Sequence, residues 1–236
     1  MYVMGIFGGW KVAAYLLSVY KNGVSVKILD DSILYLVLGI VIGGRLGHVL
    51  FYDPGMIIRN PLEILMTWQG GMSFHGGFLG VLVASIYYTR KVQIPFWSLV
   101  DIYACVTPIG LFFGRIGNFI NGELWGRVTD VPWAVIFPYP DVLPRHPSQI
   151  YEAALEGVLL LAVMLFCWTR TDMRHYCGRL SGVFAIGYAL TRSFCEIYRV
   201  PDAFVFGPLT LGQALSIPIL GVGWFLLRRP VERNAQ

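Results

Sequence analysis

The chain has 236 residues, of which 56% are hydrophobic, 15% aromatic and only 14% charged, and its mean hydropathy is +0.62. Soluble domains carry about 25% charged residues, so this composition excludes a water-soluble globule, a disordered chain and, with four cysteines, a disulfide-held scaffold. The formal net charge is +4, but no long basic run offers a nucleic-acid footprint, so we expect a membrane protein that binds no nucleic acid.

Apolar segments recur along the whole chain. A membrane-spanning helix needs about 20 predominantly apolar residues to cross roughly 30 Å of hydrocarbon. Seven segments meet this requirement, at about 1–20, 33–52, 72–89, 97–120, 150–169, 181–198 and 209–227. We therefore predict an all-α polytopic membrane protein with one integral-membrane domain over residues 1–236. Its first residues lack the basic region and cleavage site of a secretory signal peptide.

The segments between the predicted spans alternate in charge. Four basic residues lie on one side of the membrane, and ten lie on the other, namely Lys21, Lys27, Arg90, Lys91, Arg170, Arg174, Arg179, Arg228, Arg229 and Arg233. Because basic loops stay cytoplasmic, the amino end is predicted outside and the carboxyl end in the cytoplasm. The long outer segment at about 121–149 contains five prolines, which disfavour a continuous helix, and its length favours a contribution to a site.

Charged residues within the predicted spans point to function. An arginine near the bilayer centre costs about 2.5–3.5 kcal/mol on insertion scales, so each needs a partner, a wet cavity or an exit to the interface. Lys11 can extend to the interface and Glu152 lies near a span end, so neither is expected in a site. Arg45, Arg115 and Arg192 lie in the outer halves of three spans that run in the same direction.

These three arginines are expected to share one outward-facing cavity with His75, which lies at the outer end of the third span. Arg192 has Glu196 four residues onward, a spacing that allows an ion pair on one helix face. Arg115 has only Asn118 on its face, with Glu123 beyond the span. We therefore expect the cavity to keep positive charge and to bind an anionic headgroup, because the guanidinium fork fits phosphate oxygens.

His75 follows a glycine-rich stretch and precedes Gly76 and Gly77. A single histidine is more often a hydrogen-bonded structural residue than a catalyst, but histidine is also the commonest general base. The sequence holds no P-loop, HExxH, CxxC pair or dinucleotide glycine motif, so no metal, nucleotide or redox cofactor is expected. A transporter for an anionic solute and a noncatalytic membrane scaffold remain alternatives.

Five motifs together resemble the bacterial phosphatidylglycerol–prolipoprotein diacylglyceryl transferase family. The most specific is Gly114-Arg115-Ile116-Gly117-Asn118-Phe119-Ile120-Asn121-Gly122-Glu123-Leu124-Trp125-Gly126-Arg127. The others are Gly43-Gly44-Arg45, His75-Gly76-Gly77, Arg145 to Gln149 with Tyr151-Glu152, and Arg192 to Glu196 followed by Arg199 and Asp202. They extend from about the first predicted span to the last.

The resemblance implies an inner-membrane enzyme without cofactor or metal. It would move the diacylglyceryl group of phosphatidylglycerol, a lipid of the bilayer, to the lipobox cysteine thiol of a prolipoprotein signal peptide. The family's important residues map onto His75, Arg115, Asn118, Glu123, Gly126, Arg192 and Glu196. We expect His75, Arg115 and Arg192 to be catalytic, and Arg115, Asn118, Glu123, Gly126, Glu196 and Arg45 to bind substrate. Family chains begin earlier, with a Tyr-Gly pair ahead of the stretch that matches Met1-Tyr2, so we expect an upstream extension to raise activity.

Overall fold

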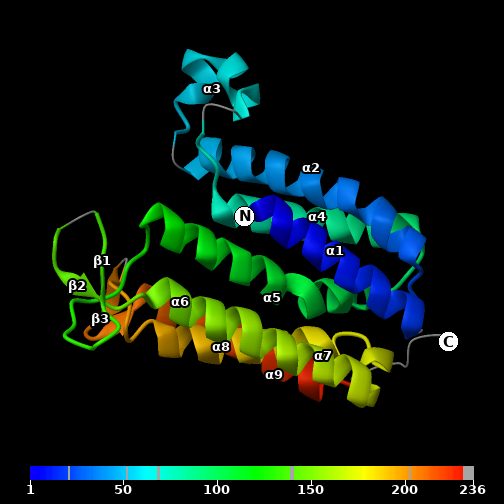
Figure 1. Cartoon of the computed structure of the whole chain (residues 1–236). Coiled ribbons are helices and arrows are strands. Elements are labelled where there is room, and N and C mark those ends of the chain that lie inside the picture. Colours follow the sequence, from blue (N-terminus) through cyan, green and yellow to red (C-terminus); the bar gives the residue numbers. More distant parts are fainter. Residues whose placement is uncertain (21, 52, 68–69, 139–140, 202, 231–236) are drawn as a thin grey trace. The chain divides into compact units, whose positions relative to one another are not determined.

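The computed structural model describes residues 1–20, 22–51, 53–67, 70–138, 141–201 and 203–230. Lys21, Asp202 and Arg233, which figure above, lie outside these ranges. The chain forms two compact units, one of Met1–Asn22 with Val100–Gln236 and one of Gly23–Leu99, which are described separately. Figure 1 gives the element labels.

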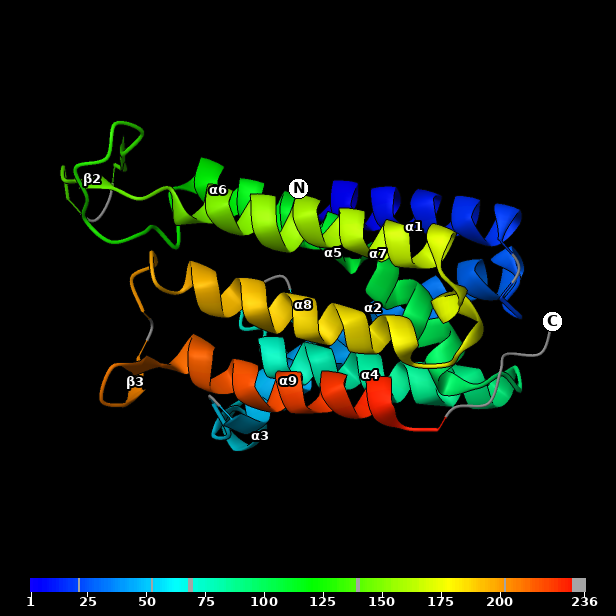
Figure 2. The same cartoon turned by 90° about the horizontal axis from the view of Figure 1, so that it is seen from below.

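The larger unit is a group of helices that run alongside one another (Figures 1 and 2). They are α1 (Tyr2–Val19), α5 (Phe96–Asn121), α6 (Ser148–Glu152) continued by the π-helix η3 (Ala153–Leu159) and α7 (Leu160–Arg170), the short η4 (Asp172–His175), α8 (Arg179–Cys195) and α9 (Leu211–Arg228). Trp168 and Met164 are fully buried among them. Asp101 of α5 caps the start of α8, accepting hydrogen bonds from the N–H groups of Gly178 and Ser181 at 2.7 Å.

Two short β-ribbons lie at one end of these helices (Figure 1). Antiparallel β1 (Val135–Ile136) and β2 (Pro144–Arg145) occupy the predicted outer segment, whose prolines indeed interrupt helix formation there. Antiparallel β3 (Phe204–Phe206) and β4 (Leu209–Thr210) connect α8 to α9. A bridge between Gly126 and Arg199 ties the two loop regions together.

The second unit pairs α2 (Val26–Phe51) with α4 (Phe74–Lys91), and short helices α3 (Met56–Arg59) and η1 (Pro61–Leu65) lie between them in the chain. Glycines allow the two long helices to touch: a Cβ on Gly43 would come within 2.8 Å of the Gly80 Cα. The helix α2 begins before the predicted residue 33. Ser25 Oγ accepts the N–H of Ile28 at this start. The charged residues Lys27, Asp30 and Asp31 lower the hydropathy of the segment, so a hydropathy reading misses it.

All seven predicted segments are helical, but they differ in length and hydropathy. Four described helices are long and apolar enough to cross a membrane: Val26–Phe51, Phe96–Asn121, the continuous Ser148–Arg170, and Leu211–Arg228. A shorter apolar helix covers Val3–Val19. Large hydrophobic side chains such as Phe7, Phe51 and Phe225 are exposed on the helices, as lipid-facing positions require.

Candidate active site

Two buried glutamates mark a local change of helix type at the end that carries the β-ribbons. Glu152 closes α6, and Glu156 lies in the π-helix that follows, and both side chains are fully buried. A Cβ on Gly157 would come within 2.7 Å of the Phe112 Cβ, so the wide turn lies directly against α5. Single π-turns are frequent at functional sites, and here the turn places two carboxylates opposite an arginine of α5.

Glu152 is shared by three arginines that come from different parts of the chain. Its Oε2 lies 3.2 Å from Nε of Arg115 on α5, and its Oε1 accepts a hydrogen bond from Nη1 of Arg192 on α8. Nη1 of Arg199, in the loop after α8, lies 3.7 Å from the same Oε1. The carboxylate therefore joins α5, α6 and α8 at one point.

Two further ion pairs extend this cluster. Nη2 of Arg115 lies 3.4 Å from Oε2 of Glu156, and Nη2 of Arg192 lies 2.8 Å from Oε2 of Glu196. The second pair confirms the interaction predicted from the (i, i+4) spacing. We call the six side chains of Arg115, Glu152, Glu156, Arg192, Glu196 and Arg199 the ion network.

The ion network corrects two expectations. Arg115 was expected to lack an acidic partner, yet it contacts two glutamates, and Glu152, expected outside the site, lies at its centre. The network holds as many carboxylates as guanidiniums, so the predicted excess of positive charge is wrong for this cluster. The reason is tertiary: the acids that balance Arg115 come from another helix, which a reading of its own helix face does not reveal.

Burial makes this pairing necessary and also useful. Removing one partner of a buried ion pair leaves an uncompensated charge, which costs about 3–5 kcal/mol. The paired glutamates hold the guanidiniums in fixed orientations, which is the preorganisation that stabilises developing charge. The Arg115 contacts, at 3.2 and 3.4 Å, exceed the roughly 2.7–2.9 Å of strong charge-assisted bonds, and its side chain is 15% exposed. Of the two arginines proposed for the phosphate, Arg115 is thus more loosely paired than Arg192, whose contact with Glu196 is 2.8 Å long.

Asn118, Glu123 and Gly126 lie just beyond Arg115, at the end of α5 and in the loop after it. Nδ2 of Asn118 donates to Oε2 of Glu123 at 3.3 Å, so these two side chains contact each other. At Gly126 a Cβ would lie 2.7 Å from the carbonyl oxygen of Tyr198 and closer still to that of His146. Gly126 is therefore the point where three loop segments cross, and its lack of a side chain permits the crossing.

Arg145 and Asp141 hold the same crossing from the outer segment. Arg145 donates to the Gly126 carbonyl oxygen at 3.1 Å and, through Nη2, to Oδ2 of Asp141 at 2.7 Å. The Arg145 guanidinium bonded to Asp141 holds the pKa of that carboxyl below its usual range. The Arg145–Asp141 pair therefore stabilises the loop crossing at Gly126.

His146 and Tyr151 are features that sequence reasoning left aside. Nδ1 of His146 lies 3.1 Å from the Tyr151 hydroxyl, which also accepts the indole N–H of Trp133 at 2.6 Å. The ring of Tyr198 contacts both, with centroids 5.2 and 5.7 Å away. One sequence signal could have identified Tyr151: it lies immediately before Glu152, within one of the family motifs.

Arg45 and His75 belong to the Gly23–Leu99 unit, where they lie near the start of α4, because Ser73 N–H donates to the Gly44 carbonyl at 2.8 Å. Arg45 is buried, and it donates to the carbonyl oxygens of Ile64, at 3.0 Å, and Gly70, at 2.6 Å. Its remaining N–H groups point at Gly71, Glu63 and the sulfur of Met56. Arg45 thus organises the segment before α4, and the His75 side chain is exposed.

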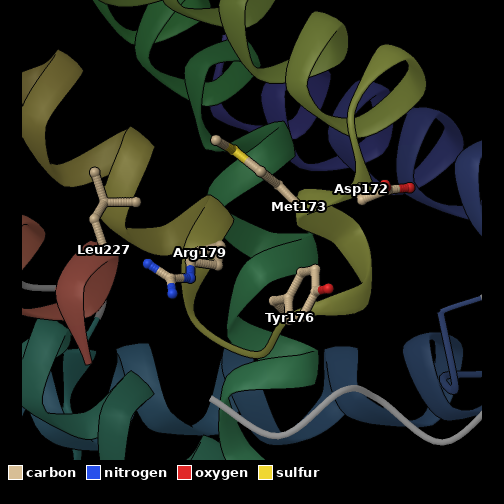
Figure 3. A pocket seen from close by; sticks show the side chains of 5 residues that line it. All are labelled: Asp172, Met173, Tyr176, Arg179 and Leu227. Atoms are coloured by element: carbon tan, nitrogen blue, oxygen red, sulfur yellow. The ribbon is translucent and has the colours of Figure 1, made fainter. Parts of the chain in front are cut away.

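A separate hollow of about 380 Å³ lies at the opposite end of α8 (Figure 3). Its lining residues are Asp172, Met173, Tyr176, Arg179 and Leu227. Arg179 begins α8 and Arg192 is near its end, so helical rise places the hollow about 20 Å from the ion network. No predicted site residue lines it. Among the described residues, no three His, Cys, Asp or Glu side chains gather as a metal site requires.

Four described helices are apolar and long enough to cross a membrane, and two of them, Phe96–Asn121 and Ser148–Arg170, carry residues of the buried ion network. These features define a helical membrane protein with a polar cluster at one end of its larger unit. Comparison with known families makes this specific. The chain belongs to the prolipoprotein diacylglyceryl transferase family, whose model matches residues 1–229.

Curated relatives share about half of the sequence over nearly the full chain. A protein of Nitrosomonas europaea is 51% identical over 232 residues, covering 96% of this chain and 82% of its own length. One from Paramagnetospirillum magneticum is 49% identical and covers 100% of this chain and 89% of its own length. One from Rhizobium meliloti is 48% identical, with coverages of 97% and 85%. Each is named phosphatidylglycerol–prolipoprotein diacylglyceryl transferase.

Proposed function

We propose that this chain transfers the diacylglyceryl group of phosphatidylglycerol to the lipobox cysteine of a prolipoprotein signal peptide. The cysteine sulfur forms a bond to the terminal glyceryl carbon of the lipid, and the bond from that carbon to the phosphate oxygen breaks. The electron pair of the broken bond leaves with glycerol phosphate, and the thiol proton passes to a base. Family membership favours this reaction over the anionic-solute transporter that composition left open.

The observation that carries the proposal at the atomic level is the shared carboxylate of Glu152. It holds Arg115 and Arg192 together, so two guanidiniums from α5 and α8 are oriented at one place. The phosphate gains negative charge as the carbon–oxygen bond breaks, and oriented guanidiniums stabilise that charge more than water does. Arg115 is the first candidate for this contact, because its ion pairs are the longer ones, and Arg192 is the second.

The carboxylates give the network its specificity for a charged transition state. A guanidinium already paired with glutamate gains little from a neutral ligand, whereas a phosphate with growing charge competes for its N–H donors. Glu196 and Glu152 keep Arg192 in place while Arg115 turns toward the leaving group. Asn118 and Glu123, at the end of the same helix, are proposed to bind the glycerol hydroxyls, and Gly126 shapes the loop beside them.

His75 is the proposed base for the lipobox thiol. A free thiol has a pKa of about 8.5 and is only a few per cent ionised at neutral pH, so a base raises the concentration of the nucleophile. Histidine suits this role because it is the side chain that most often acts as a general base. The proposal for His75 rests on residue chemistry and the motif His75-Gly76-Gly77. Arg45 is proposed to support the segment that precedes it.

The proposed setting is the bacterial cytoplasmic membrane. The charge alternation supports seven spans with the amino end outside, and the loops at 121–149 and 196–211 then face the periplasm. The ion network lies at the helix ends that meet these loops, so the reaction is proposed to occur toward the periplasmic side, where exported prolipoproteins present their lipobox.

The decisive experiment supplies the purified chain with phosphatidylglycerol vesicles and a lipobox peptide. Mass spectrometry should detect a peptide heavier by one diacylglyceryl group, joined as a thioether, together with released glycerol phosphate. A peptide with serine in place of the lipobox cysteine should remain unmodified. Uptake of an anionic solute into vesicles with no thioether product would contradict the proposal.

A further inference from the structure

The first turn of α9 lies against the carboxylate of Glu196. A Cβ built on Gly212 would lie 2.7 Å from both Cδ and Oε2 of Glu196 and 2.9 Å from its Oε1. These are separations that real Cβ atoms do not adopt, so no side chain fits at position 212 while Glu196 stays where it is. Glu196 is 1% exposed, and the surrounding protein leaves its carboxylate little room to move.

The start of α9 is anchored, so it does not easily retreat from Glu196. Thr210 Oγ1 accepts the N–H of Gln213, and the Gln213 side chain accepts the N–H of Thr210, which completes a capping box. The Leu211 N–H donates to the Ala203 carbonyl at 2.9 Å, and β3 pairs with β4 immediately before the helix. The capped helix start carries partial positive charge, which favours the carboxylate beside it.

We propose that Gly212 is a positioning residue for the transfer reaction, acting through Glu196 on Arg192. Its missing side chain leaves the space in which the Glu196 carboxylate lies 2.8 Å from Nη2 of Arg192. Arg192 is thereby held from two sides, by Glu196 and by Glu152. A side chain at position 212 would displace the carboxylate and tilt the guanidinium away from the leaving phosphate. The inference rests on the proposed function.

Helix propensity alone predicts the opposite outcome for Gly212→Ala. Gly212 has ordinary helical backbone angles, and alanine is favoured over glycine within a helix. If packing against Glu196 were unimportant, Gly212→Ala would leave activity unchanged and would slightly raise stability. The close contact instead requires a loss of activity.

The matched control is Gly221, which lies in the same helix and has no atom within 4 Å of a built Cβ. Gly212→Ala should lower kcat for thioether formation by about 10-fold or more, because small displacements of oriented groups cost up to about 100-fold. The KM for phosphatidylglycerol should change by less than about twofold, since the lost interaction belongs to the transition state. Gly221→Ala should retain wild-type kinetics. Equal kinetics of the two variants would overturn the inference.

A second substitution tests the path through Glu196. Glu196→Asp withdraws the carboxylate by one carbon–carbon bond, about 1.5 Å, which makes room for a Cβ at position 212. Because Glu196→Asp itself withdraws the carboxylate from Arg192, Gly212→Ala should cost little further activity in that background, so the two effects should be non-additive. If Gly212→Ala does not accumulate in membranes, the double variant must accumulate. Additive effects, or failure of both proteins to accumulate, would overturn the inference.

Unfolding temperatures in detergent separate this inference from the proposed function. They are measured for wild type, Gly212→Ala, Glu196→Asp and the double variant. A wild-type chain that forms no thioether would refute the proposed transfer. The Gly212–Glu196 contact would then still require non-additive changes in unfolding temperature for the two substitutions, and additive changes would refute the contact itself.

Discussion

Glu152 holds Arg192 by a hydrogen bond although the two residues are 40 positions apart in the chain. Its other carboxylate oxygen contacts Arg115, so one fully buried acid fixes two arginines from two helices. This relationship, rather than a free positive charge, prepares the guanidiniums for phosphate. Replacing Glu152 should therefore disturb the ion network more than replacing any other member of it.

Glu152→Gln should nearly abolish transfer while keeping side-chain shape. The amide cannot balance Arg115 and Arg192, and breaking a buried ion pair costs about 3–5 kcal/mol. Thioether formation should fall by about 100-fold or more, because both guanidiniums lose their orientation. The measurement is the initial rate on phosphatidylglycerol vesicles, together with the unfolding temperature. Asp130→Asn, an exposed acid of the outer segment, is the control and should retain wild-type values. Wild-type activity in Glu152→Gln would refute this role.

Arg115→Lys should not restore the activity lost in Arg115→Ala. An ammonium keeps the charge but lacks the planar fork that contacts Glu152 and Glu156 together and then binds phosphate. We expect a reduction in kcat of about 10-fold or more for the lysine variant, from the loss of bidentate binding. Arg170→Lys, the same substitution in an exposed position at the end of α7, is the control and should retain wild-type activity. Full activity of Arg115→Lys would show that charge alone suffices.

His75→Ala should abolish transfer while the protein still inserts into membranes, because the lipobox thiol loses its proposed base. His75→Gln keeps hydrogen-bonding capacity without titrating near neutrality and should also be inactive. Raising the pH should partly restore both variants, since the thiol then ionises without help. The measurement is the pH–rate profile between about pH 6 and about pH 9, a range that includes the thiol pKa of about 8.5. Full activity in His75→Gln would leave His75 a structural residue.

Gly43→Ala should destabilise the α2–α4 pair. The added Cβ would lie 2.8 Å from the Gly80 Cα, a backbone atom that moves only if the helices separate. Overpacking of this kind costs about 1–3 kcal/mol. At Gly77 the nearest atom would be 3.6 Å away, an ordinary contact, so Gly77→Ala is the control. Thermal unfolding in detergent should show a lower midpoint for Gly43→Ala only, and equal midpoints would contradict the packing argument.

Asp141 should make the outer segment sensitive to acid. Its pKa is lowered by the hydrogen bonds from Arg145, so the carboxylate stabilises the folded state at pH values above its unfolded pKa of about 3.9. This contribution is lost as the pH falls through that value and below. Wild type and Asp141→Asn should therefore differ in unfolding temperature at neutral pH and converge under acid conditions. A difference that persists unchanged at low pH would refute the assignment.

Several parts of the site were predictable because they depend on local spacing. The apolar segments correspond to helices, since each must satisfy its backbone hydrogen bonds within itself. Arg192 and Glu196 were expected to pair because residues four apart share a helix face, and they do. The charged residues stood out within the spans because burying a charge without a partner is costly.

The sequence alone determined the membrane class, the helical segments and the family, since hydropathy, charge alternation and motif residues are all written locally. Only the tertiary structure decided that Glu152 is central, that Arg115 is paired and that Gly212 borders Glu196. These relationships join α5, α6, α8 and α9, and the choice of neighbouring helix depends on how whole faces pack. That information is absent from the spacing within any one helix, and for this reason the balance of charge in the site was misjudged from sequence.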